Sequence, residues 1–255
     1  MRAKKSLGQH FLTSESALVA IIEAGSLQHD DTVLEIGPGK GVLTRELLTH
    51  AGKVIAIEKD RELVALLSKK FTDALHIKHL ILIEHDILTW NSISTFSKKT
   101  PYKIIANIPY YITGAILEKF LSAEHQPQLL VLLVQKEVAQ RIVARDGKES
   151  ILSLSVKVYG EPRVVKIIPR GAFTPTPTVD SAILAIANIS RNNFVDVEEA
   201  KFFTLVKKGF GSKRKFLRSN LGVSEEVFMK CDIPLKARAE DLTLQQWLSL
   251  AHALS

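Results

Sequence analysis

The sequence predicts an α/β fold built on a mostly parallel sheet, with a smaller helical domain at its carboxyl end. Three observations support this prediction. Apolar strand-like runs alternate with helical segments, a glycine-rich turn follows the first run, and residues 129–134 form a continuous apolar run typical of a strand buried on both faces. With 255 residues, 46% of them hydrophobic, the chain can form one sizeable α/β domain and an appendage.

The predicted elements follow one another in βα order. Helical periodicity covers residues 42–50 and 61–71, each after a strand-like run, and a third helix is expected over residues 112–122. Residues 163–168 and 181–189 resemble a closing antiparallel pair. The strands before them are expected at residues 32–36, 53–58, 80–84, 103–106 and 129–134.

Beyond Ser190 the pattern becomes helical and basic. We therefore expect one domain over residues 1–189 and a small helical basic domain over residues 190–255. The net charge of +7 is concentrated, since residues 201–218 hold seven basic residues and no acidic one. Such a cluster suits a polyanion, although a solvated helix face gives the same pattern. The candidate contacts are Lys207, Lys208, Lys213, Arg214, Lys215 and Arg218.

Cysteine content and hydropathy indicate the compartment. Cys231 is the single cysteine, which excludes an intrachain disulfide framework or a thiolate zinc cluster and fits a reducing environment. No run approaches the roughly 20 apolar residues of a membrane span, and residues 1–12 lack the apolar core of a signal peptide. We expect a cytoplasmic protein with no membrane partner. No metal is expected either, because His76, His79 and His85 lack a supporting carboxylate cluster.

The glycine turn, residues 35–41, predicts a nucleoside cofactor site. Backbone without side chains can approach a ligand closely there, and the following helix directs its amino-terminal dipole toward it. The Gly-x-Gly-x-Gly spacing does not match dinucleotide binders or phosphate loops. Glu58 ends the next strand, where a carboxylate can accept from both ribose hydroxyls, and Asp86 follows the third strand, within reach of the base.

Asn107, Ile108, Pro109 and Tyr110 form the most informative stretch of the chain. A side-chain amide, a proline-fixed turn and an aromatic ring follow an apolar strand-like run. This combination suits methylation of an amino group on a flat base, because acceptors can hold the nitrogen while a π-face holds the ring. Loop packing and a simple turn would use the same residues.

With these residues in view, the chain resembles the ribosomal RNA adenine N6-dimethyltransferase family. The resemblance spans most of the length and includes residues 6–12, 35–41, 107–110, 135–138, 173–182 and 210–221. It implies a Rossmann-like methyltransferase fold with a mostly parallel seven-stranded sheet, S-adenosylmethionine as cofactor, and adjacent adenines near the 3′ end of small-subunit RNA as target.

The resemblance also implies roles for individual residues. His10 and Leu12 would line the cofactor pocket, although many family members carry Asn at the position of His10. Gly37 would meet the cofactor backbone, with Glu58 on its ribose, Asp86 on its adenine amino group and Asn107 joining both sites. On the target adenine, the Asn107 Oδ1 and the Ile108 carbonyl would accept from the amino group, Pro109 would fix the turn, Tyr110 would stack, and Phe173 would cover the other face.

The implied partner is small-subunit ribosomal RNA in a pre-ribosomal particle, bound by a monomer through the basic segment. Three alternatives remain. A large-subunit RNA adenine methylase of the macrolide-resistance type shares the glycine turn and residues 107–110, whereas residues 179–182 and the basic tail favour the small-subunit enzyme. A DNA adenine methylase would carry a different Asn/Asp-Pro-Pro-Tyr/Phe motif. A non-catalytic ribosome-assembly factor could use the same scaffold.

Overall fold

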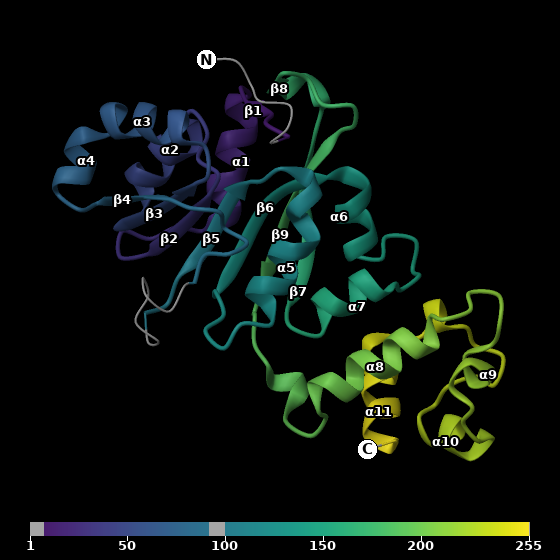
Figure 1. Cartoon of the computed structure of the whole chain (residues 1–255). Coiled ribbons are helices and arrows are strands. Elements are labelled where there is room, and N and C mark those ends of the chain that lie inside the picture. The colour runs from purple at the N-terminus through teal and green to yellow at the C-terminus, as the bar shows by residue number, and fades with distance from the viewer. Residues whose placement is uncertain (1–7, 92–99, 255) are drawn as a thin grey trace. The chain divides into compact units, whose positions relative to one another are not determined.

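The computed structural model describes residues 8–91 and 100–254 and separates into two compact units (Figure 1). The first, which we call the sheet unit, comprises Met1–Ala139 and Arg163–Ile189. The second, the helical unit, comprises Gln140–Pro162 and Ser190–Ser255.

This division differs from the predicted domains, residues 1–189 and 190–255, in one segment. Both place a change at residue 190, whereas residues 140–162 group with the helical unit here and with the sheet in the prediction. Contacts between distant segments explain this, because the Asn193 Nδ2 donates to the Val158 carbonyl at 2.7 Å and the Tyr159 ring packs edge-on against Phe194. Residues 163–189, which separate these two segments in the sequence, belong to the sheet unit. The order of residues along the chain therefore does not indicate that residues 140–162 group with the helical unit.

A seven-stranded sheet forms the centre of the sheet unit, in the order β4-β3-β2-β5-β6-β9-β7. The neighbours from β4 to β6 pair in parallel, and β9 runs antiparallel to β6. The predicted α/β fold and strand positions are therefore confirmed. The bounds are β2 Thr32–Ile36, β3 Lys53–Glu58, β4 Leu80–Glu84, β5 Lys103–Asn107, β6 Leu129–Gln135, β7 Glu161–Ile168 and β9 Ser181–Ala187.

Helices cover the sheet on both sides, with α1 behind it and α5 in front in Figure 1. The Ser14 and Asp60 side chains cap the amino ends of α1 and α3. Alternating strand residues such as Val33, Ile105 and Val131 pack in one core cluster with residues of α1 and α2. The bounds are α1 Glu15–Gly25, α2 Val42–His50, α3 Arg61–Lys70, α4 Thr72–His76, the 3-10 helix η3 Tyr110–Ile112, α5 Thr113–Leu121 and α6 Lys136–Ile142.

A second, two-stranded sheet ties the amino-terminal segment to the proline-rich loop. Strand β1 (Phe11–Leu12) pairs antiparallel with β8 (Phe173–Thr174), after the 3-10 helix η4 (Arg170–Ala172). The Thr13 backbone N–H extends this pairing by donating to the Ala172 carbonyl at 2.8 Å. Residues 11 and 12 are thereby fixed beside a segment about 160 residues later in the chain.

The helical unit has its own core, in which Phe202, Phe228 and Trp247 are fully buried. Gly209 allows this packing, because a Cβ there would lie 2.4 Å from the Trp247 ring. No helix among the described residues is both long and apolar enough to span a bilayer. The elements are α7 Ile151–Lys157, η5 Asn192–Phe194, α8 Glu199–Gly209, α9 Leu217–Leu221, α10 Glu225–Lys230, η6 Ala239–Asp241 and α11 Leu244–Ala253.

Candidate active site

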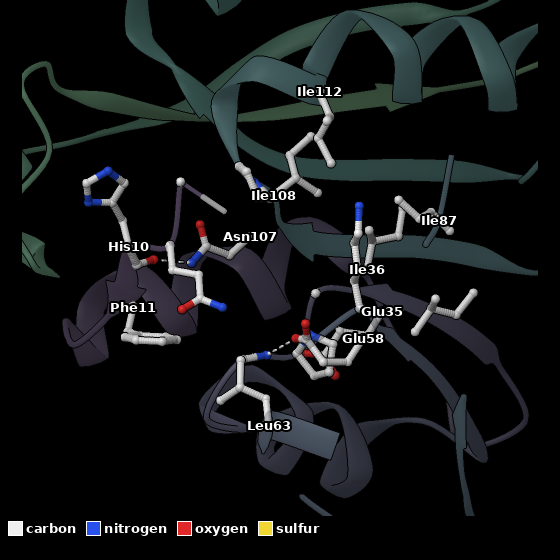
Figure 2. A pocket seen from close by; sticks show the side chains of 18 of the residues that line it. His10, Phe11, Glu35, Ile36, Glu58, Leu63, Ile87, Asn107, Ile108 and Ile112 are labelled. Carbon is white, nitrogen blue, oxygen red and sulfur yellow. Dashed lines mark hydrogen bonds between the residues drawn. The ribbon is translucent and has the colours of Figure 1, made fainter. Parts of the chain in front are cut away.

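A cavity lies at the carboxyl ends of β2, β3 and β5 and is bounded by the amino-terminal segment (Figure 2). This is the sheet edge at which parallel α/β folds bind their ligands. Nine of the sequence-predicted site residues line it: His10, Leu12, Gly37, Glu58, Asp86, Asn107, Ile108, Pro109 and Tyr110.

The glycine turn borders the cavity with backbone that only glycine adopts easily. Gly37 has a φ of +66°, and a Cβ built on it would meet no atom within 4 Å, so the space beside its backbone is open. Its N–H donates to the Ile57 carbonyl at 2.9 Å, which fixes the turn to β3. Gly41 caps α2 with a φ of +72°, and a Cβ there would lie 2.6 Å from the Phe71 ring. The turn is therefore rigid and leaves room for a ligand.

Glu58 is held in one orientation by the backbone. Its Oε2 accepts from the Gly39 N–H at 3.1 Å, and its Oε1 accepts from the Asp60 N–H at 2.9 Å. Each carboxylate oxygen can accept a second hydrogen bond, so Glu58 can still receive the two hydroxyls of a ribose. Burial raises the pKa of Glu58 above its usual 4.5, and the backbone donors oppose that rise.

Asp86 lies just beyond β4 and is ion-paired. Its Oδ2 accepts from the Lys59 Nζ at 2.8 Å, and its Oδ1 accepts from the Leu88 N–H at 3.0 Å. The hydrogen bond from Lys59 holds the pKa of Asp86 below its usual 3.8. Asp86 is therefore an ionised acceptor at neutral pH, as an amino group on a base would require.

The Asn107 amide is oriented by the amino-terminal segment. Its Nδ2 donates to the His10 carbonyl at 3.1 Å, as Figure 2 shows. His10 is held in turn by the proline-rich loop, because its Nδ1 lies 2.7 Å from the Pro175 carbonyl and must donate to it. Because the Nδ2 donates to the His10 carbonyl, the amide is held in one orientation, in which its Oδ1 can accept a hydrogen bond from a ligand.

The Tyr110 ring follows Asn107 and is anchored through its hydroxyl. Its OH lies 2.6 Å from the Ser181 Oγ at the start of β9. Burial raises the pKa of Tyr110, so the phenol stays neutral and can share a proton with the serine. The His10 ring lies nearly parallel to it, with an interplanar angle of 18° and centroids 6.1 Å apart. Through this hydrogen bond, the segment of residues 173–182 holds the Tyr110 ring in place.

Phe173 lies apart from the other predicted site residues. Only 2% of its surface is exposed, and it belongs to the core cluster that also contains Leu12, its partner across the β1–β8 pair. It does not contribute to the cavity wall, so in this structure its ring does not face the cavity, and its role in covering the base stays a prediction. The pairing that buries Phe173 joins segments far apart in sequence, which no local pattern reveals.

Sequence reasoning gives no individual role to three charged residues in the cavity wall, two of which, Glu35 and Lys40, lie within the predicted glycine turn. Lys59 lies there beside Asp86, and Lys40 places its Nζ 4.6 Å from the centre of the Phe11 ring. Glu35 is 1% exposed, and its carboxylate oxygens form no well-aligned hydrogen bond with the described residues. Burial raises the pKa of Glu35 from 4.5 to about 8; the nearby Thr44 hydroxyl opposes this rise and the charge of Glu58 adds to it. An acidic residue inside the apolar run of β2 was the signal that could have identified it.

The basic residues predicted to contact a polyanion differ in their availability. Lys208 donates to the Leu221 carbonyl at 2.8 Å, and Arg218 is ion-paired with Glu225. The other four, Lys207, Lys213, Arg214 and Lys215, are exposed and form no ion pair with the described residues.

Within residues 8–91 and 100–254, no group of three His, Cys, Asp or Glu side chains could hold a metal ion.

The sheet order, the open glycine turn, Glu58 at the end of β3 and Asp86 just beyond β4 identify the fold as that of a Rossmann-like methyltransferase. Residues 1–255 match the model of one family, described as ribosomal RNA adenine dimethylase. The chain therefore belongs to the ribosomal RNA adenine dimethylase family.

Similar proteins with assigned names agree with this membership. A protein named ribosomal RNA small subunit methyltransferase A from Dehalococcoides mccartyi is 44% identical, covering 98% of this chain and 88% of that protein. A protein of the same name from a Nostoc species is 39% identical, covering 100% of this chain and 98% of that protein.

Solved structures share the architecture over nearly the whole chain. A dimethyladenosine transferase from Plasmodium falciparum matches with a TM-score of 0.79 and 27% identity, covering 94% of this chain and 96% of that one. The 23S rRNA methyltransferase ErmE matches with a TM-score of 0.77 and 26% identity, covering 96% and 99%.

Family membership makes S-adenosylmethionine the cofactor, and the residues present fit it. The open space beside Gly37 admits a ligand against the backbone, and two carboxylates at successive strand ends suit a ribose and an adenine amino group. The buried carboxyl of Glu35 adds a polar group at the wall of the same cavity.

Proposed function

We propose that this chain transfers methyl groups to N6 of two adjacent adenines near the 3′ end of small-subunit ribosomal RNA, giving dimethyladenosine. The relatives at 39% and 44% identity carry the small-subunit activity in their names. The observation that supports the chemistry best is the Asn107 amide, whose nitrogen is bound by the His10 carbonyl so that its oxygen can accept from a substrate.

Cofactor binding is assigned to the residues around the glycine turn. Gly37 gives access to the backbone, Glu58 accepts the ribose hydroxyls, and Asp86 accepts the amino group of the cofactor adenine. His10 and Leu12 cover the cavity from the amino-terminal segment. When bound, S-adenosylmethionine supplies an electrophilic methyl group on its sulfonium sulfur.

The chain's own contribution to methyl transfer is positioning. The Asn107 Oδ1 and the Ile108 carbonyl accept from the adenine amino group, which draws its lone pair out of conjugation with the ring. Pro109 fixes the turn that presents these two acceptors side by side. The same acceptors disperse the positive charge that develops on N6, so a strong general base is not needed.

The target base is held by Tyr110. Its ring is fixed at the hydroxyl end by Ser181, so its face is presented at a constant angle. Because Phe173 is buried, we assign the opposite side of the base to His10, whose ring is nearly parallel to that of Tyr110. Insertion of the base would require the two rings to separate slightly beyond their 6.1 Å centroid distance.

RNA binding is assigned to the basic segment of the helical unit. Lys207, Lys213, Arg214 and Lys215 are available for phosphate contacts, whereas Lys208 and Arg218 already have partners within the unit. We infer that the enzyme acts as a monomer in the cytoplasm, on a pre-ribosomal small-subunit particle.

The deciding experiment offers labelled S-adenosylmethionine with three unmethylated substrates: small-subunit particles, large-subunit RNA and duplex DNA. Mass spectrometry of the digested nucleosides should find dimethyladenosine in the small-subunit sample alone. Label only in large-subunit RNA would select the resistance-type activity. Tight particle binding without any label would indicate an assembly factor.

A variant of Asn107 tests the mechanism. Asn107→Ala should lower the rate of methyl transfer by about 100-fold or more, because an acceptor present in the transition state is lost. Circular dichroism should show an intact fold. The matched control is Asn193→Ala, which removes an amide from the helical unit and should leave the rate unchanged. An active Asn107→Ala protein would refute the proposed geometry.

A further inference from the structure

Phe216 is an aromatic side chain exposed within the most basic stretch of the chain. It is 44% exposed and ends a run of six exposed residues, 211–216, between α8 and α9. Among the aromatic residues that the structure describes, only Phe216 and Tyr111 are exposed, and Tyr111 lies at the cavity already described. Single exposed apolar residues are common, so the surroundings of Phe216 decide whether it has a role.

The backbone around Phe216 is firmly held. The next residue, Leu217, is fully buried, and its N–H donates to the Ala237 carbonyl at 2.8 Å. The Phe216 carbonyl accepts from the Asn220 N–H at 3.2 Å. The Asn220 side chain also bonds the start of the exposed run, because its Nδ2 donates to the Gly209 and Ser212 carbonyls at 2.7 and 3.0 Å. The ring is thus exposed on an ordered turn, and little backbone entropy is lost when a ligand covers it.

The charge beside Phe216 favours a nucleic acid. Lys213, Arg214 and Lys215 precede it directly, are exposed, and have no acidic partner among the described residues. Three cations attract phosphates, while a single flat ring offers a base its π-face. Phe216 is the only exposed large apolar side chain between Lys207 and Arg218, which is too little apolar surface along this stretch for the core of a protein interface.

We propose that Phe216 is a stacking platform for an unpaired base of the RNA whose phosphates contact Lys213, Arg214 and Lys215. This site rests on the proposed function, since it requires an RNA substrate. Stacking would let the protein favour single-stranded RNA without relying on charge. When the unpaired base stacks on the Phe216 ring, both flat surfaces are removed from water.

The test measures binding of a fluorescent single-stranded RNA, and of the same sequence as a duplex, over a series of salt concentrations. Phe216→Leu should weaken single-strand binding by on the order of tenfold and leave duplex binding unchanged, because duplex bases are already stacked. The dependence of log Kd on log salt should keep its wild-type slope. Phe216→Tyr and Phe216→Trp should bind as the wild type does.

Two controls separate stacking from charge and from folding. Replacing Lys213, Arg214 and Lys215 by Ala should lower the salt slope by about 2, at roughly 0.7 for each single-strand phosphate contact. Val195→Ala removes an apolar side chain that is 79% exposed elsewhere in the helical unit and should change neither affinity nor slope.

Wild-type affinity of the Phe216→Leu protein for single strands would overturn the proposal. An equal loss in Phe216→Tyr, or a changed salt slope in Phe216→Leu, would also overturn it, since neither follows from loss of a ring face. If the wild-type protein methylates small-subunit particles but does not bind the single strand, or if Phe216→Leu binds the single strand equally well, only the stacking site fails. If the wild-type protein neither methylates nor binds small-subunit particles, the proposed function fails.

Discussion

Glu35 makes the stability of the sheet unit depend on pH. Glu35 is 1% exposed, its carboxyl group forms no well-aligned hydrogen bond within residues 8–91 and 100–254, and burial raises its pKa from 4.5 to about 8 against the opposing effect of the Thr44 hydroxyl. Below about pH 4.5 the group is protonated in both the folded and the unfolded chain, and its contribution to stability is fully present. Between about pH 4.5 and 8 the unfolded chain releases the proton while the folded chain keeps it, so the free energy of unfolding falls as pH rises.

The size of the effect follows from the two pKa values. At about 1.4 kcal/mol for each pKa unit, the change from 4.5 to about 8 corresponds to about 5 kcal/mol, lost progressively up to pH 8. Glu35→Gln keeps the shape of the side chain but cannot ionise. Its unpaired amide adds a cost that is the same at every pH, so the difference in stability between variant and wild type isolates the titration.

The assay is urea unfolding at a series of pH values between 5 and 9. Trp90 lies in the sheet unit and Trp247 in the helical unit, so a Trp247→Phe background makes fluorescence report on the sheet unit alone. The Glu35→Gln protein should gain several kcal/mol relative to its parent between pH 5 and 8. Glu84→Gln, at an exposed position that ends β4, should follow the parent. Parallel pH profiles for Glu35→Gln and its parent would refute the reasoning.

Further predictions concern the two sites. Ser181→Ala removes the 2.6 Å hydrogen bond to the Tyr110 hydroxyl, so it should lower kcat about tenfold and the free energy of unfolding by about 1 kcal/mol, with cofactor affinity unchanged. Adding Tyr110→Phe should lower kcat and stability no further, and additive losses in a double-mutant cycle would contradict this. Lys59→Met frees the Oδ2 of Asp86 and removes a positive charge near a cationic cofactor, so calorimetry should find binding tighter by a factor of about 3, corresponding to less than 1 kcal/mol. Asn220→Ala loses two hydrogen bonds to carbonyls and should lower the free energy of unfolding of the helical unit by about 1–3 kcal/mol; an unchanged urea midpoint would show that the turn does not need them. Hydrogen exchange over residues 8–12, which border the cavity, should slow on addition of S-adenosylmethionine, and unchanged exchange would argue against closure of these residues over the cofactor.

Local sequence patterns are sufficient to predict the strands of the sheet and the glycine turn. The strands at residues 32–36, 53–58 and 80–84 were predicted with the bounds that the structure gives them, because continuous apolar runs and turn residues act over a few positions. Gly37 could be assigned to the cofactor turn for the same reason. The position of a strand end follows from the strand, so Glu58 and Asp86 could be placed at the cavity before any coordinates were known.

Contacts between distant segments could not be predicted in this way. The Asn107 amide is oriented by His10, 97 residues earlier, and the Tyr110 hydroxyl by Ser181, 71 residues later. A phenylalanine suits either a base-binding position or the core, so the residue type of Phe173 does not distinguish the two. It is the pairing of β1 with β8 that accompanies its burial.

Sequence patterns are enough to predict the α/β framework, the glycine turn, the acidic strand ends and the resemblance to a family of adenine dimethyltransferases. The folded structure is needed to find which side chains are oriented, buried or ion-paired: the Lys59–Asp86 pair, the buried carboxyl of Glu35, and the grouping of residues 140–162 with the helical unit. Propensity and periodicity depend on neighbours along the chain, whereas hydrogen bonding, burial and pKa depend on neighbours in space.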